Sequence, residues 1–152
     1  MAAATSTSEA RDLSLGVPLA EVVEGQPIAG QVNAEPVLLS RLDGELHAIG
    51  GACTHYGGPL SEGLIAGETV RCPWHHACFS LKTGEALAAP AFAGVDVWQV
   101  EFEGDQVFVR RKADTEQPKP RRTDGDRLER VLIVGGGAAG FAAAEMLRRS
   151  GY

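Results

Sequence analysis

Two short stretches of the chain each pair a thiol with an imidazole: Cys53 with His55, and Cys72 with His75, with residues 56–71 between them. Zinc fingers bring two cysteines together first and then two histidines. Mixed pairs on two loops suit a centre of two metal ions, in which one ion takes both thiolates and the other takes both imidazoles. A structural zinc site built from the same four side chains stays an alternative, because zinc is the commonest metal for such a set.

The residues around these pairs fit loops that wrap a metal centre. Gly57, Gly58 and Gly63 allow the first loop to bend tightly and to bring backbone N–H groups toward bridging sulfides. Pro59 and Pro73 restrict the conformations of the two loops.

The Cys-x-His and Cys-x-x-His pattern resembles the Rieske [2Fe–2S] family, and the resemblance covers about residues 12–111. It implies a [2Fe–2S] cluster whose ligands are Cys53, His55, Cys72 and His75. It also implies that Ala89-Pro90-Ala91 lies in a third loop that covers the cluster.

Two departures from the family pattern bear on the redox potential. High-potential Rieske proteins carry a disulfide between the ligand loops, where this chain has Gly58 and Trp74. They also carry a serine and a tyrosine whose hydroxyls donate to sulfur, where this chain has Ala77 and Phe79. Hydrogen bonds to sulfur raise the potential, so the resemblance implies the low end of the Rieske range, near roughly −150 mV.

The remaining cysteine and histidines are interpreted as non-ligands. Cys78 is predicted to be a buried free thiol, since free cysteine is among the most buried residue types. His76 follows His75 directly, and consecutive residues of an extended segment point to opposite faces, so it is predicted not to bind the metal. His47 lies on a predicted strand and is expected at the surface.

Charge and composition indicate a globular protein and limit the partners that it can bind. The chain has 44% apolar and 22% charged residues, an ordinary globular composition, and no apolar run long enough to span a membrane. Residues 1–111 hold 14 acidic and 6 basic side chains, and residues 112–152 hold 6 and 8, so that −8 and +2 give the total of −6. An acidic body argues against nucleic acid and anionic membranes as partners. The expected partner is a redox protein or a flavin domain of the same chain.

Cysteine usage bears on the compartment. The chain has 3 cysteines, and assigning two of them to the metal leaves a single thiol. This argues against a disulfide scaffold and for a reducing compartment, so we expect the protein in the cytoplasm.

Short alternating segments predict an all-β domain of small antiparallel sheets, with the ligand loops at one end. No segment before residue 111 has helical periodicity. A hairpin turn is predicted at Asp43-Gly44. The predicted strands cover residues 37–42, 45–49, 69–71, 95–102 and 106–109.

The composition changes three times along the chain. We expect residues 1–11 to be a disordered lead-in, because they are rich in Ala, Ser and Thr and do not form a signal peptide. Residues 12–111 form the Rieske domain, and residues 112–128 form a charged linker that contains prolines. Residues 129–152 are predicted to begin an incomplete Rossmann domain.

The prediction of an incomplete Rossmann domain depends on a glycine-rich turn. Residues 131–134 form a continuous apolar segment, which indicates a buried parallel strand, and residues 141–149 are predicted to be helical. Between them, Gly135, Gly137 and Gly140 match the G-x-G-x-x-G dinucleotide-binding pattern. An ordinary glycine-rich strand–helix turn is the alternative. The acidic residue expected about 20 positions later falls past Tyr152, so we expect a piece of a longer protein.

The combination of a Rieske domain, a charged linker and a dinucleotide turn resembles the Rieske-bearing NAD(P)H oxidoreductases, including the apoptosis-inducing-factor-like proteins. Residues 72–80 and 82–86 are similar to that family in particular. The resemblance implies FAD in the longer protein, with electrons passing from NAD(P)H through FAD to the cluster. This stretch alone would then be an electron-transfer module, whether or not the longer protein is an enzyme. A stand-alone Rieske-type ferredoxin serving an oxygenase, and a non-enzymatic redox sensor, are the alternatives.

Overall fold

The hairpin predicted at Asp43-Gly44 is the centre of the larger of two sheets. In the computed structural model, which describes residues 11–114 and 130–149, β3 (Glu35–Leu42) pairs antiparallel with β4 (Glu45–Gly50). The turn residues have φ of 51° and 83°, the conformation that a two-residue hairpin requires. The hairpin prediction is confirmed.

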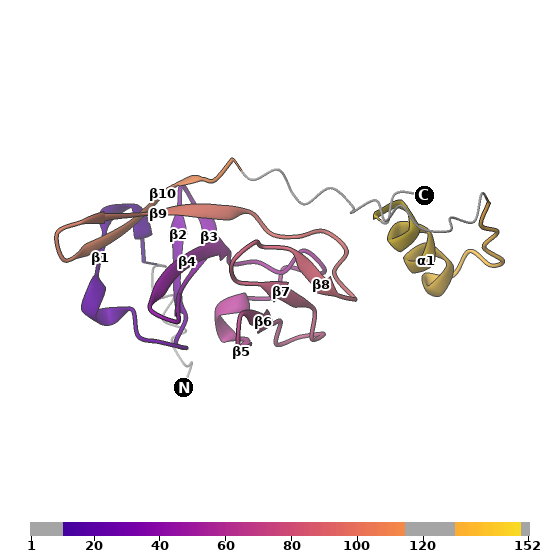
Figure 1. Cartoon of the computed structure of the whole chain (residues 1–152), viewed down its shortest axis with the longest axis horizontal. Coiled ribbons are helices and arrows are strands. Elements are labelled where there is room, and N and C mark those ends of the chain that lie inside the picture. The colour runs from indigo at the N-terminus through magenta and orange to yellow at the C-terminus, as the bar shows by residue number, and fades with distance from the viewer. Residues whose placement is uncertain (1–10, 115–129, 150–152) are drawn as a thin grey trace, which may run out of the picture. The chain divides into compact units, whose positions relative to one another are not determined.

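Six antiparallel strands form this larger sheet, in the order β1-β10-β9-β4-β3-β2 (Figure 1). The β9–β10 pair is the second predicted hairpin. The other four strands of the sheet are β1 (Val17–Pro18), β2 (Ile28–Val32), β9 (Val97–Glu103) and β10 (Gln106–Lys112).

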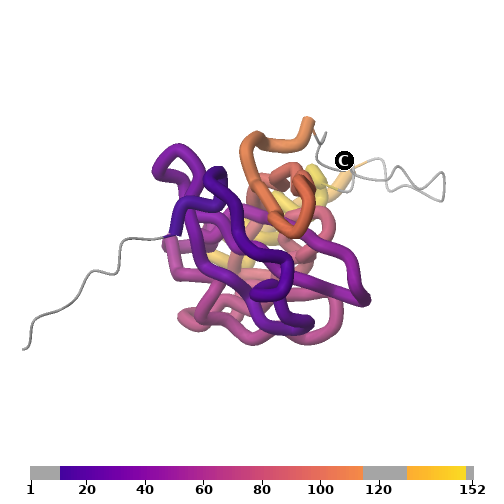
Figure 2. The backbone as a smooth tube through the Cα atoms, turned by 90° about the vertical axis from the view of Figure 1, so that its left-hand side faces the viewer, coloured from indigo at the N-terminus to yellow at the C-terminus, as the bar shows by residue number. Residues whose placement is uncertain are grey.

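The smaller sheet is an insertion between β4 and β9. These two strands are neighbours in the larger sheet, where Ala48 pairs with Trp98, and the chain between them builds a separate four-stranded sheet. Figure 1 shows this segment to one side of the N-terminal strands, and in the end-on view of Figure 2 much of it lies behind them. In order, its strands are β5 (Leu64–Ala66), β6 (Thr69–Arg71), β7 (Cys78–Ser80) and β8 (Ala86–Ala88).

Short 3-10 turns complete this part of the chain, at Leu13–Leu15, Leu19–Glu21 and Leu60–Glu62. None of the described residues forms a helix long and apolar enough to cross a membrane. The prediction of an all-β fold of small antiparallel sheets is confirmed.

Strand β3 is buried on both faces, which explains its nearly continuous apolar sequence. Val37 and Leu39 pack in the core of the larger sheet, together with Val107 and other buried residues. Leu38 and Leu42 belong to a second core. That second core includes Cys53, Leu60, Val70, Cys72, Ala77 and Phe79 of the smaller subdomain. The larger sheet therefore serves as the base on which the cysteine-bearing loops are built.

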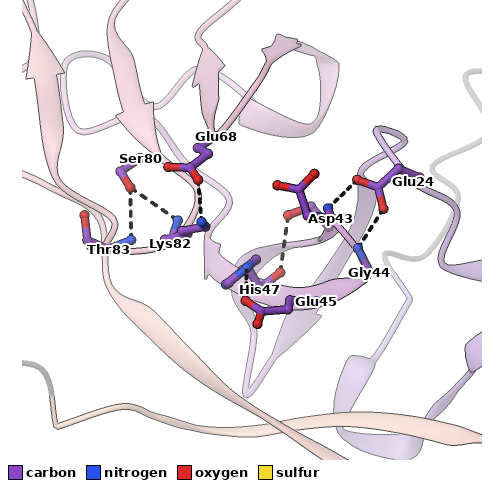
Figure 3. A network of polar contacts seen from close by, with 10 residues as sticks. Glu24, Asp43, Gly44, Glu45, His47, Glu68, Ser80, Lys82 and Thr83 are labelled. Carbon is purple, nitrogen blue, oxygen red and sulfur yellow. Dashed lines mark hydrogen bonds and ion pairs between the residues drawn. The ribbon is translucent and has the colours of Figure 1, made fainter.

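A polar network lies where the β3–β4 hairpin approaches the smaller subdomain (Figure 3). Glu24 accepts hydrogen bonds from the backbone N–H groups of Asp43 and Gly44, and Lys82 pairs with Glu68. Glu68 is the main cause of the raised pKa of Lys82, with smaller contributions from Glu45 and Asp43. The carboxylates of Asp43 and Glu45 on the hairpin thus favour the charged form of Lys82 in the smaller subdomain.

His47 and Arg11 differ from their predictions. The His47 side chain is only 18% exposed and lies 3.8 Å from the carboxylate of Glu45, so placing it at the surface was wrong. It is largely covered because β4 is an internal strand of the larger sheet. The predicted lead-in, residues 1–11, lies outside the described residues except for Arg11. The Arg11 carbonyl accepts a hydrogen bond from Gln31 N at 2.8 Å, so the fold already includes it.

The second unit of the chain is Glu116–Tyr152, of which residues 130–149 belong to the described residues. Its helix α1 (Ala138–Arg149) starts three residues before the predicted helix. Residues 131–134 pair with no other segment among those described. A strand needs a neighbour to satisfy its backbone, and the described residues supply none for this segment, as expected of an incomplete Rossmann unit. That these residues form a strand in a longer protein stays a prediction. The predicted linker, 112–128, lies outside the described residues beyond Asp114.

Candidate metal centre

The first ligand loop leaves the end of β4 and closes on itself through its backbone. Cys53 N donates to Gly58 O at 2.8 Å, and Gly57 N donates to Cys53 O at 2.7 Å. Gly57 has a φ of 74°, a conformation that favours glycine. This closed turn holds Cys53 in the buried core and leaves His55 half-buried at its edge.

The second ligand loop joins β6 to β7 and has a similar closed form. Cys72 N donates to Ala77 O at 2.8 Å, and His76 N donates to Cys72 O at 3.1 Å. His76 has a φ of 60°. It is therefore a turn residue, and the extended segment from which its non-ligating role was argued does not exist. That His76 is not a ligand stays a prediction.

The two loops bring like atoms together. Cys53 and Cys72 are both buried in one core, and Cys72 contributes to the raised pKa of the Cys53 thiol. The ring centroids of His55 and His75 lie 4.9 Å apart with their planes at 86°. His75 is exposed, so the imidazole pair is nearer to solvent than the thiol pair. The structure thus brings the two cysteines into one core and the two imidazoles into contact. That these four residues bind one cluster stays a prediction.

The donor set fits a binuclear iron–sulfur cluster. His55 Nδ1 is buried and has no hydrogen-bond partner, a situation that costs about 1–3 kcal/mol unless something satisfies the atom. A metal ion bound to this nitrogen would satisfy it. Among the described residues, no three His, Cys, Asp or Glu side chains surround a point that could hold one metal ion. A binuclear cluster with two protein ligands on each iron does not require such a point.

Backbone donors surround the Cys53 sulfur. Burial raises the pKa of the Cys53 thiol, and the neighbouring Cys72 raises it further. The backbone N–H groups of His55 and Tyr56 donate to the sulfur and lower the pKa. The same N–H groups are available to a thiolate once a metal ion holds the sulfur in that form.

A third segment contacts the first ligand loop, and that residues 89–91 cover a cluster stays a prediction. Thr54 Oγ1 donates to Ala93 O at 2.6 Å. Ala91, within the predicted covering segment, is buried in the same core as Cys53 and Cys72. The side chain between the two proposed ligands of the first loop is thereby tied to the segment that leads into β9.

Two aromatic residues at the site were not recognised as site residues in the sequence. The ring of Tyr56 lies 4.4 Å from the ring of His55 and 5.8 Å from that of His75, measured between centroids. Trp74 packs its ring against the backbone at Gly58. The position of Tyr56, directly after His55, is the one signal that pointed to it. Trp74 was noted only as a residue that cannot form a disulfide.

The glycine-rich turn in the second unit has a close backbone approach. Gly135 has a φ of 108°, and a Cβ added at Gly140 would lie 2.1 Å from the carbonyl oxygen of Gly135. Glycine is therefore required at the start of α1 by space, which agrees with the packing role of the third glycine in the pattern. That Gly135, Gly137 and Gly140 bind a dinucleotide stays a prediction.

Comparison with known families settles what kind of domain this is. Residues 16–99 match the model of the Rieske [2Fe–2S] domain. The chain belongs to the Rieske family. Rieske domains bind a [2Fe–2S] cluster with cysteine and histidine ligands, and the chain is accordingly an electron-transfer domain.

Relatives of this Rieske domain fall into two kinds. The chain is 40% identical over 143 residues to human "Apoptosis-inducing factor 3", a match that covers 87% of this chain and 24% of that protein. It is 38% identical over 94 residues to the "3-phenylpropionate/cinnamic acid dioxygenase ferredoxin subunit" of Escherichia coli K12, covering 60% of this chain and 87% of that protein. The chain thus spans about a quarter of the first relative and most of the second.

The fold is also similar to that of a solved ferredoxin. The "Ferredoxin of carbazole 1,9a-dioxygenase from Nocardioides aromaticivorans IC177" superimposes with a TM-score of 0.60 at 27% sequence identity. The superposition covers 62% of this chain and 93% of the ferredoxin. Nearly all of that small protein therefore has a counterpart here.

Proposed function

We propose that this Rieske domain carries single electrons through a cluster held by Cys53, His55, Cys72 and His75. The observation that carries the proposal is that the two cysteines are buried in one core while the two imidazoles are in contact and His55 Nδ1 has no partner. A bound [2Fe–2S] cluster supplies reversible one-electron chemistry at this position.

The protein contributes position and environment. Cys53 and Cys72 sit in the second core, so water is kept from the sulfur side. The exposed His75 and the half-buried His55 form the outer side, where a redox partner can approach. The backbone N–H groups of His55 and Tyr56 favour the thiolate form of Cys53. Electron exchange with a partner is therefore expected at the histidine side.

In the finer proposal, the domain is the N-terminal module of a flavin-dependent NAD(P)H oxidoreductase, with FAD bound elsewhere in the longer protein. The match over 87% of this chain to "Apoptosis-inducing factor 3" supports it, as does the glycine-rich turn before α1. The flavin domain of the same chain would then be the redox partner, with Gly135, Gly137 and Gly140 at its pyrophosphate. Residues 12–111, 112–128 and 129–152 are the proposed Rieske domain, linker and start of the flavin domain.

A stand-alone electron carrier for an oxygenase is the second candidate. The Escherichia coli ferredoxin subunit and the carbazole dioxygenase ferredoxin support it, since this chain matches about nine-tenths of each. A redox sensor would instead bind a partner in only one oxidation state. The three buried, unbridged cysteines support a reducing compartment for any of these roles, and we propose the cytoplasm.

The cluster itself is tested by analysing the purified chain. We expect about two irons and two acid-labile sulfides per chain, and a Rieske-type EPR signal after reduction. His55→Cys or His75→Cys alters or abolishes the spectrum, because an imidazole is replaced by a thiolate. One zinc per chain and no labile sulfide, in protein produced with ample iron, would overturn the proposal.

A further inference from the structure

The two ligand loops contact one another through Gly58 and Trp74, neither of which is a proposed ligand. Gly58 of the first loop is buried, and the ring of Trp74 from the second loop lies over it. A Cβ added at Gly58 would be 2.8 Å from Cys72 Sγ, and 3.1 and 3.3 Å from Cδ2 and Cε3 of Trp74. Gly58 is not in the left-handed region. Space alone therefore demands glycine here.

Each loop is otherwise closed on itself. The backbone hydrogen bonds run from Cys53 and Gly57 within the first loop, and from Cys72 and His76 within the second. In the part of the chain that the structure describes, no backbone hydrogen bond joins one loop to the other. The spacing of the loops therefore depends on contacts between side chains, or between a side chain and the opposite backbone.

The Trp74 ring is placed to supply such a contact. It is 54% exposed, so close to half of the side chain is covered, and Cys72 beside it is 2% exposed. Glycine at position 58 lets the ring approach the backbone more closely than any other residue there would permit. The Cys72 sulfur lies near the same point, 2.8 Å from the Cβ that Gly58 lacks.

We propose that Trp74 is a positioning residue, whose ring rests on Gly58, sets the spacing of the two ligand loops and shields the Cys72 sulfur from water. The inference rests on the proposed ligand set. It assigns a role to two positions that have no ligand atom, and it adds a second reason, beside the approach of Cys72 Sγ, why Gly58 has no side chain.

The test compares variants of the 152-residue chain that have been loaded with cluster. Trp74→Ala is expected to lose its visible absorbance about tenfold faster than wild type in the presence of an iron chelator, equivalent to about 1.4 kcal/mol in the barrier. Its midpoint potential is expected to rise, because water that reaches the Cys72 sulfur donates hydrogen bonds to the reduced centre. Trp74→Phe keeps a flat ring and should restore most of both properties.

Leu64→Ala is the matched control. Leu64 is 66% exposed on β5 of the same subdomain and lies outside both ligand loops. Its replacement should change the rate of cluster loss by less than twofold. It should leave the midpoint potential equal to that of wild type within error. If Trp74→Ala behaves as Leu64→Ala does, the inference is wrong even though the cluster is present. If the wild-type chain binds no cluster, the proposed function fails and the inference with it.

A double-mutant cycle tests the contact itself. Gly58→Ala should displace the ring and speed cluster loss, and Trp74→Ala added to it should then have little further effect. Fully additive effects of the two substitutions would show that Trp74 does not act through Gly58. The fluorescence of Trp74, recorded in a Trp98→Phe background, should change on Gly58→Ala, and this readout does not depend on electron transfer.

Discussion

At the scale of single residues, two apolar side chains near the cysteines offer no donor to sulfur, in contrast to the backbone N–H groups of His55 and Tyr56. Ala77 and Phe79 are fully buried in the same core as Cys53 and Cys72, and neither has a hydroxyl. We expect Ala77→Ser with Phe79→Tyr to raise the midpoint potential. One added hydrogen bond of about 1–1.5 kcal/mol corresponds to roughly 50 mV in a one-electron couple. Protein-film voltammetry measures it, and an unchanged potential would mean that the hydroxyls do not reach sulfur.

The three cysteines should behave differently on substitution. Cys78 is buried on β7, outside the sulfur pair. Cys78→Ser is expected to keep the visible and EPR spectra, with a loss of stability of about 1–3 kcal/mol for a buried hydroxyl. Cys72→Ser should lose or grossly change the spectra, because a ligand is exchanged. Spectra that change equally in both variants would contradict the proposed ligand set.

Residue types and spacing were enough to pick out two cysteines that share a core and two histidines whose rings are in contact. They could not show which atom of His55 is buried without a partner, because that depends on the tertiary packing around the ring. They also gave the wrong reason for setting aside His76. Its left-handed conformation depends on the hydrogen bond to Cys72 O, which no alternation rule contains.

At the scale of elements, the position of Cys72 depends on a close approach between β6 and the turn before β5. A Cβ at Gly63 would lie 2.2 Å from Arg71 O, in the residue just before Cys72. We expect Gly63→Ala to lower the free energy of unfolding by about 1–3 kcal/mol and to reduce cluster content, since β6 must move. Thermal unfolding and iron analysis measure the two effects.

Gly67→Ala is the control for that substitution. Gly67 lies in the β5–β6 turn with a φ of 55°, and nothing lies within 4 Å of an added Cβ. It should lose some stability through backbone strain, about 1–2 kcal/mol, yet keep its cluster. Equal loss of cluster in both variants would show that general destabilisation, and not the displacement of β6, is responsible.

The sequence pattern predicted strands correctly where the described part of the chain also supplies a strand to pair with them. The β3–β4 and β9–β10 hairpins were recognised because turn residues and alternation agree with the final pairing. The apolar segment at residues 131–134 has the same strength of pattern, and yet it forms no strand. Leu132 and Val134 are 88% and 90% exposed. Pattern alone cannot report whether the partner strands are in the chain.

At the scale of the whole molecule, this chain covers only 24% of "Apoptosis-inducing factor 3". The activity expected of this chain must therefore be considered apart from the activity of a longer protein. The described part of the second unit consists of the apolar segment 131–134 with Arg130 before it, the glycine-rich turn and α1. Such a turn can contact a pyrophosphate, but a flavin also needs contacts for its ribose and ring.

We therefore expect the 152-residue chain neither to bind FAD tightly nor to oxidise NAD(P)H, even when its cluster is present. Titration with FAD, followed by flavin fluorescence, should show no stoichiometric binding. NADH and NADPH absorbance should stay constant with an artificial acceptor present, while chemically reduced cluster passes electrons to the same acceptor. Sustained turnover would contradict this expectation, because residues 130–149 would then have to complete a flavin site from one turn and one helix.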